Sequence, residues 1–100
     1  MTTLTSSFDI ADYLESDEDI QAFLLEAIQD GSSEHLLHCL NVAAKAKGMT
    51  EVAKQAGVTR ASLYKSLTEN ANPKLDTIVR LLAVFNCQLS ITPLNAQSHQ

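Results

Sequence analysis

Four side chains on one short stretch of the chain have chemistry suited to duplex DNA. They are Arg60, Ala61, Tyr64 and Lys65. On a helix over residues 60–67, all four project away from the apolar face. An arginine can pair with the O6 and N7 atoms of guanine, and an alanine can contact the methyl group of thymine, while a tyrosine and a lysine one turn deeper can reach a base edge or a phosphate. The set predicts contacts to bases in the major groove, with Arg60 as the foremost candidate.

Polar side chains around this stretch predict contacts to the phosphate backbone. They are Thr50, Thr59, Ser62, Asn70, Asn72 and Lys74. Hydroxyl groups, amide groups and backbone N–H groups at helix starts commonly donate to phosphate oxygens. An alternative stays open for some of the set, because Lys65 and Lys74 can be ordinary solvated lysines and the asparagines can serve only to shape a turn.

Residues 49–68 (MTEVAKQAGVTRASLYKSLT) have the pattern of a helix-turn-helix, which would position these side chains. Thr50 is the expected N-cap of the first helix and Thr59 that of the second. Gly57 allows a sharp turn in the left-handed backbone conformation. Ala53 lies where the helices must cross, and a larger side chain there would overpack the contact. Such a helical hairpin can also be scaffold alone, an alternative that the pattern leaves open.

Apolar residues at helical spacing predict further helices on both sides of the motif. The first runs from a Ser16 cap to Gly31, the next from Ser33 to Gly48, and the last from Pro73 to Asn86. A short apolar lead-in precedes them at Phe8, Ile10, Tyr13 and Leu14. The buried stripe of the first helix is expected to comprise Ile20, Phe23, Leu24, Ala27 and Ile28.

The segment 88–92 (QLSIT) alternates polar and apolar residues, which predicts one short β-strand. No other stretch offers a convincing mate, and a lone strand cannot satisfy its own backbone hydrogen bonds. We therefore expect it to pair with its counterpart in a second copy, or with the edge of another protein. The alternative is an irregular extension packed on Phe85 by Leu89 and Ile91.

Charge is divided unevenly along the chain. The net charge is −5, and residues 1–34 hold nine acidic residues and no lysine or arginine. All seven lysines and arginines lie within residues 45–80. DNA affinity responds to the local field at the contact surface, so an acidic total does not exclude binding. The acidic part would repel DNA and should face away from it, and it would suit a basic protein partner.

Other function classes find little support in these residues. No nucleophile with a paired base, no carboxylate pair and no phosphate-binding glycine loop is present, so we predict that the chain is not an enzyme. His35, His38 and Cys39 share one helical face, but a fourth ligand would have to come from elsewhere, so no metal or other cofactor is expected. Cys39 and Cys87 are expected to be reduced thiols of a cytoplasmic protein, and no apolar stretch predicts a membrane span.

Two resemblances add to these inferences. The motif MTEVAKQAGVTRASLYKSLT resembles the Cro/phage-repressor family of DNA-binding domains. A wider likeness over about residues 8–93, carried by FDIADYL, GMTEVAKQAGVTRASLYKSL and NPKLDTIVRLL, resembles the HigA-like addiction-module antitoxins found beside RelE/ParE-like toxins. It implies a homodimer that represses its own operon at double-stranded operator DNA and neutralises a small basic toxin.

The predicted fold is all-α, with five to six helices in a lambda-repressor-like arrangement. An acidic helical extension (1–32) precedes the DNA-binding domain with its pairing strand (33–93), and a disordered tail (94–100) follows. The predicted function is that of a sequence-specific DNA-binding antitoxin of a type II toxin–antitoxin module. Two alternatives stay open: a phage-type transcriptional regulator without a toxin partner, and an interaction module that keeps the motif only as scaffold.

Overall fold

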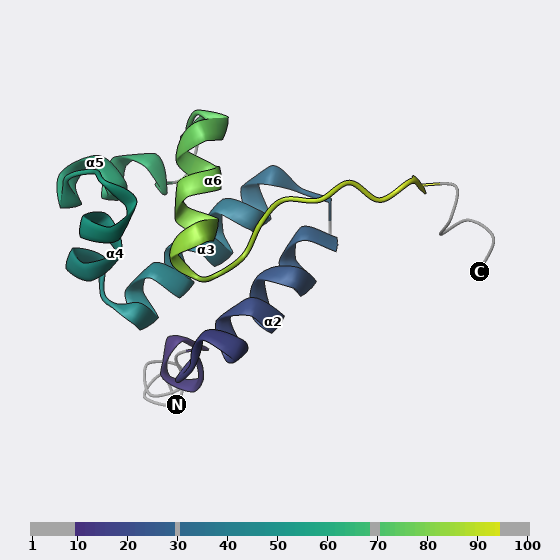
Figure 1. Cartoon of the computed structure of the whole chain (residues 1–100), viewed down its shortest axis with the longest axis horizontal. Coiled ribbons are helices and arrows are strands. Elements are labelled where there is room, and N and C mark those ends of the chain that lie inside the picture. The colour runs from purple at the N-terminus through teal and green to yellow at the C-terminus, as the bar shows by residue number, and fades with distance from the viewer. Residues whose placement is uncertain (1–9, 30, 69–70, 95–100) are drawn as a thin grey trace, which may run out of the picture.

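The computed structural model describes residues 10–29, 31–68 and 71–94, which form helices joined by short connections (Figure 1). The elements are a 3₁₀ turn, η1 (Ile10–Tyr13), and the α-helices α2 (Asp17–Gln29), α3 (Ser33–Lys47), α4 (Met49–Ala56), α5 (Arg60–Ser66) and α6 (Leu75–Val84). These described residues contain no β-strand, in keeping with the predicted all-α class. Within the same residues, no helix has the length and apolar character needed to cross a membrane.

Local sequence explains where several helices begin and end. The Ser16 hydroxyl accepts a hydrogen bond from the Asp19 backbone amide (3.1 Å) at the start of α2, and the Ser32 hydroxyl accepts one from the His35 amide (3.2 Å) at the start of α3. Gly48 has φ 110° and ends α3 while also preceding the first residue of α4. Because glycine tolerates this backbone conformation, the two helices meet without an intervening loop.

One hydrophobic core receives side chains from all five α-helices. Its largest fully buried side chains are Phe85, Leu40, Leu63, Leu81 and Val52. The acidic helix α2 packs along α3 and contributes Ile20, Leu24 and Ala27 to the same cluster. The N-terminal helix therefore shares its core with the helices that follow it.

Polar contacts also hold α2 against the rest of the molecule. Asp17 forms an ion pair with Lys47 at the end of α3 (2.9 Å) and accepts a hydrogen bond from the Asn86 side chain (3.2 Å). The Gln21 side chain donates to the backbone carbonyl of Phe85 (3.0 Å). The predicted division between residues 1–32 and 33–93 stays a prediction, and these contacts weigh against treating the two parts as independent.

Helix ends differ from the prediction by one or two residues. The helix expected over residues 60–67 ends at Ser66, and the helix expected to begin at Pro73 begins at Leu75. Ile28, expected in the buried stripe of α2, is exposed, because the buried positions of this helix end at Ala27.

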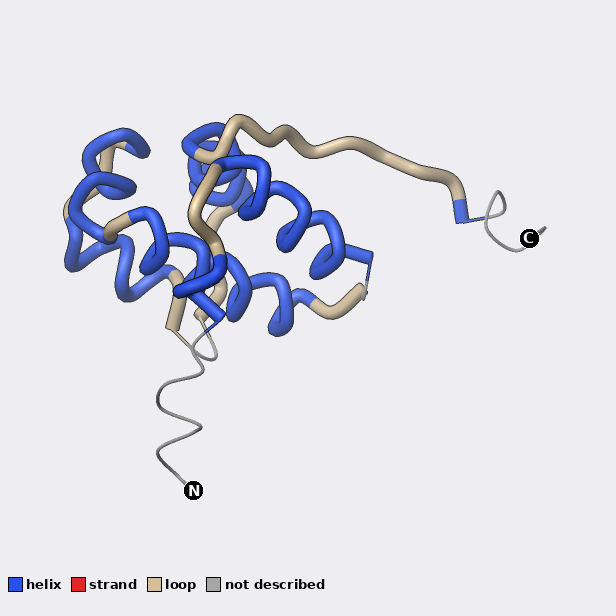
Figure 2. The backbone as a smooth tube through the Cα atoms, turned by 90° about the horizontal axis from the view of Figure 1, so that it is seen from below, coloured by secondary structure: helices blue, strands red, loops and turns tan. Residues whose placement is uncertain are grey.

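The segment after α6 is an extended loop, so the predicted strand is wrong for the single chain. Figures 1 and 2 show it leaving α6 and running beyond the helical body. Alternation determines which side chains would share a face, but a strand forms only where a neighbouring backbone offers hydrogen-bond partners, and the described residues offer none. The alternative, an irregular extension packed on Phe85, is also wrong for Ile91, because this side chain is 97% exposed and does not cover Phe85. Pairing of this segment with a second copy stays a prediction, and residues 95–100 of the expected tail lie outside the described residues.

Candidate nucleic-acid interface

The helices α4 and α5 are joined by a tight turn whose geometry follows from its residues. Gly57 adopts the left-handed conformation (φ 76°, ψ 30°), and its N–H group points back to the last turn of α4. Val58 is partly buried and packs against the core. Thr59 is extended, and its hydroxyl accepts a hydrogen bond from the Ser62 amide (3.0 Å). The predictions of a left-handed glycine at 57 and a helix cap at 59 are confirmed.

All four side chains predicted to contact bases lie on α5 and are exposed. They are Arg60, Ala61, Tyr64 and Lys65. The opposite face of α5 carries Leu63, which is fully buried, and Leu67 caps the helix from inside the core. The core thus holds α5 by one face and leaves the face that bears Arg60 open to solvent.

Arg60 is held by a hydrogen bond that crosses from α5 to α4. Its Nη1 atom donates to the Thr50 hydroxyl oxygen at 3.0 Å. The prediction that Thr50 caps α4 is wrong, because the helix already begins at Met49 behind Gly48 and has no side-chain cap. The Thr50 hydroxyl is instead available to orient the guanidinium, whose remaining N–H groups can serve a ligand.

The predicted phosphate-contacting residues fall into two sets. Thr50, Thr59 and Ser62 lie on or beside the α4–α5 pair and are exposed, and each threonine hydroxyl that accepts a bond can still donate its own proton. Asn72 and Lys74 are exposed on the connection into α6, and within the described part of the chain no hydrogen bond or ion pair joins their side chains to α5. Asn70 lies outside the described residues.

Two cations near this surface were not among the predicted contacts. Lys54 is exposed one turn along α4 from Thr50. Residues four apart on a helix share a face, so this spacing could have identified Lys54 as a further candidate for a phosphate contact. Arg80 of α6 forms an ion pair with Asp76 (3.1 Å), and its Nη1 atom lies 3.8 Å from the position that a Cβ on residue 57 would occupy. Arg80 comes near the turn only because α6 packs on α4. The spacing of residues along the sequence therefore does not predict its position.

The histidine and cysteine residues of α3, with Cys87 after α6, do not assemble a metal site. Among the described residues, no group of three or more histidine, cysteine or carboxylate side chains is placed to hold an ion. The His35 Nε2 and Cys39 Sγ atoms lie 3.6 Å apart. Burial raises the pKa of the Cys87 thiol, and the nearby Asp17 carboxylate raises it further.

Comparisons with known proteins address the function from a separate direction. Residues 4–93 match a family model described as "Probable addiction module antidote protein". The chain is also similar to an uncharacterized protein of Haemophilus influenzae, with 35% identity over 91 residues that cover 91% of this chain and 94% of the relative. No solved structure matches the chain. The lambda-repressor-like arrangement therefore stays a prediction.

Proposed function

This chain belongs to the family of probable addiction module antidote proteins, and from that premise we propose that it is an antitoxin that also binds the DNA of its own promoter. It neutralises a small basic toxin of the RelE/ParE-like kind and represses the operon that encodes both proteins. The observation that carries the DNA-binding part is the exposed face of α5, on which Arg60 is oriented by Thr50. In this proposal α4 and α5 are the two helices of a helix-turn-helix.

The side chains of α5 divide the work of recognition by their chemistry. Arg60 pairs with guanine through two N–H groups, and Ala61 contacts a thymine methyl group. Tyr64 and Lys65 reach a base edge or a phosphate farther along the groove. Thr50 and Thr59 donate to phosphates at the edge of the groove, which fixes the register of α5 on the duplex, and Ser62, Asn70, Asn72 and Lys74 are further candidates for this role.

The proposed active species is a homodimer. Two copies of α5 would then lie about 34–36 Å apart, one helical turn of DNA, and would contact the two halves of a pseudo-palindromic operator. The exposed segment 88–92 is the first candidate for joining the two copies, because its backbone is extended and unpaired within the described residues. The homodimer also fits the modest affinity expected of one acidic chain for DNA.

The DNA-binding part is tested by fluorescence anisotropy with a fragment of the chain's own promoter. Arg60→Ala should weaken binding by about 1–3 kcal/mol, because a bidentate contact to one base pair is lost. Arg60→Lys keeps the charge but loses the planar fork, so it should bind nonspecific DNA like the wild type and discriminate poorly between operator and mutated operator. The slope of log affinity against log salt should be steep and should fall by about 0.9 for each phosphate contact removed.

Two outcomes would contradict the DNA-binding part of the proposal, and a third would contradict the antitoxin part. Unchanged operator preference in both Arg60 variants would remove Arg60 from base recognition. No binding of the promoter fragment by the wild type at low salt would leave α4 and α5 as scaffold. Absence of a copurifying basic protein encoded beside this chain would favour the phage-type regulator instead.

A further inference from the structure

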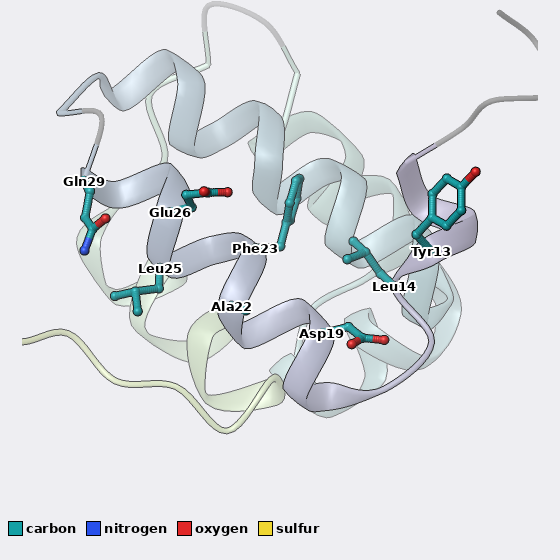
Figure 3. Close-up of a pocket in the computed structure, with 8 residues that line it drawn as sticks. All are labelled: Tyr13, Leu14, Asp19, Ala22, Phe23, Leu25, Glu26 and Gln29. Atoms are coloured by element: carbon teal, nitrogen blue, oxygen red, sulfur yellow. The ribbon is translucent and has the colours of Figure 1, made fainter.

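A shallow groove follows α2 next to η1, at the end of the molecule away from α5 (Figures 1 and 3). Its volume is roughly 490 Å³, and its wall mixes apolar side chains (Tyr13, Leu14, Ala22, Phe23 and Leu25) with the polar side chains of Asp19, Glu26 and Gln29. Figure 3 shows Phe23 and Glu26 projecting from the same side of α2, with Tyr13 and Leu14 at one end of the groove. Its lining residues on α2 run from Asp19 to Gln29, and the groove is open to solvent, so a partner segment could lie along it.

Two of the larger side chains beside the groove lie mostly outside the core. Leu25 and Tyr13 are each 60% exposed, although both lie on or beside a helix that buries other apolar residues well. A leucine side chain stabilises a protein when folding removes it from water. An exposed Leu25 therefore adds little to the folding stability of the isolated chain. Exposed apolar residues clustered beside a groove mark a surface suited to a protein partner.

Both charged residues that line the groove, Asp19 and Glu26, are acidic. Residues 10–29 contain six carboxylates and no lysine or arginine. Asp17 is neutralised by Lys47, and Asp19 accepts a hydrogen bond from the Glu15 amide (3.0 Å). Glu18 and Glu26 are exposed and have no cationic partner among the residues that the structure describes. A segment that fills this groove must therefore supply positive charge as well as an apolar side chain.

We propose that this groove is the surface that docks the toxin, through a basic segment of the toxin with an apolar anchor. The inference rests on the proposed antitoxin function and adds where on the chain neutralisation occurs. A second copy of the chain is the poorer occupant, because two copies meeting through their grooves would bring like carboxylates together. Duplex DNA is excluded by the same charge. Toxin and operator then occupy opposite ends of the antitoxin and can be bound at the same time.

The test uses the full chain, co-expressed with the product of the adjacent reading frame, and measures the affinity of the purified pair. Leu25→Lys and Glu26→Lys each place a cation in the groove and should weaken the complex about tenfold or more. The matched controls are Leu75→Lys on α6, where the leucine is 69% exposed, and Glu51→Lys on α4, both away from the groove. The controls should stay within about twofold of the wild type, since rim and remote charges contribute little to affinity.

The outcomes separate this inference from the proposed function. If the wild type captures no neighbouring gene product, the antitoxin role and the groove both fall. If the wild type binds it and the Leu25 and Glu26 variants bind equally well, the groove is wrong while the antitoxin role stands. If light scattering shows that the same variants convert a dimer to a monomer, the groove is a subunit interface and not a toxin site. Thermal melts of all four variants should match the wild type, because every substituted side chain is exposed.

Discussion

The two ends of this small molecule carry opposite chemistry on one shared core. At the α4–α5 end most exposed side chains are cationic, hydroxylic or small, with Glu51 the one carboxylate on these two helices, and residues 35–100 hold seven lysines and arginines against three acidic residues. At the η1–α2 end they are carboxylates mixed with exposed apolar side chains such as Leu25. The net charge of −5 is thus the sum of two regional charges of opposite sign, so it does not describe the local charge of either surface. A small domain can therefore present surfaces for two unlike partners without a second core.

Both ends of the molecule depend on the shared core, and Leu40→Ala tests this dependence with the largest expected effect. Leu40 is fully buried in α3, between the two ends. Its truncation should lower the free energy of unfolding by about 2–5 kcal/mol, because apolar contacts are lost and a cavity remains. Chemical denaturation gives the free energy, and hydrogen exchange reports α2 and α5 separately. Leu75→Ala, at an exposed position, is the control and should change stability by no more than about 0.5 kcal/mol.

Both ends should lose protection together in the Leu40 variant. Earlier exchange of α2 amides than of α5 amides, with separate unfolding transitions, would show that residues 1–32 are an independent extension after all. That result would support the division that the sequence predicts and would mean that the two ends do not depend on one shared core.

Two glycines allow the α4–α5 connection and the α2–α3 connection to be tested in the same way, because each has a left-handed backbone conformation. Gly57 (φ 76°) joins α4 to α5, and Gly31 (φ 84°) lies between α2 and α3. Alanine at either position should cost about 1–2 kcal/mol of stability, because the left-handed conformation is unfavourable for a residue with a Cβ. Neither site is crowded: a Cβ at 57 would meet only Arg80 at 3.8 Å, and one at 31 would meet nothing within 4 Å.

The functional consequences of these two substitutions should differ. Gly57→Ala should also weaken promoter binding in an anisotropy assay, since it alters how α5 leaves α4, whereas Gly31→Ala should bind DNA as the wild type does. Gly57→Asn should recover part of the lost stability, because asparagine tolerates this conformation better than alanine. Equal loss of DNA binding at both sites would argue that stability alone explains the effect.

A smaller effect is expected at Cys87, whose pKa reports the negative electrostatic potential near Asp17. Burial is the main cause of its raised pKa, and the Asp17 carboxylate is the second. Because the folded pKa is raised, the contribution of this thiol to stability is complete below its unfolded pKa and is lost as pH rises through the folded value. The pH profile of alkylation at Cys87, followed by mass spectrometry, should therefore lie to higher pH in the folded than in the denatured chain.

Substitutions at neighbouring acids separate the two causes. Asp17→Asn should move the Cys87 profile partway back toward the denatured one. Glu18→Gln removes the same charge one residue away and is the control, with a smaller shift expected. An unchanged profile in Asp17→Asn would mean that burial alone raises the pKa.

Local rules account for much of the fold. The Ser16 cap, the Thr59 cap and the left-handed Gly57 were predictable, because each depends on residues within one helical turn. The strand at 88–92 was not correctly predictable, because alternation cannot say whether a partner backbone is present. The cap at Thr50 failed for a related reason: Gly48 serves two helices at once, so α4 begins before the residue with the better capping chemistry.

The candidate interface was predictable in its members but not in its arrangement. Arg60 and its neighbours on α5 follow from helical periodicity, and all are exposed as expected. The contact between Arg60 and Thr50 spans ten residues and depends on the angle at which α4 and α5 cross. The groove beside α2 could not be predicted from the sequence either. Helical periodicity predicts which residues face away from the core, but it does not predict which of them line a groove.

The bond from Arg60 to Thr50 has a consequence for the thermodynamics of association. A free arginine side chain loses about 2 kcal/mol of rotational entropy when a contact fixes it. Here the threonine hydroxyl restricts those rotations as the chain folds, before any partner arrives. Whatever meets the guanidinium thus finds it partly immobilised, and position 50 can tune affinity without touching the bound molecule.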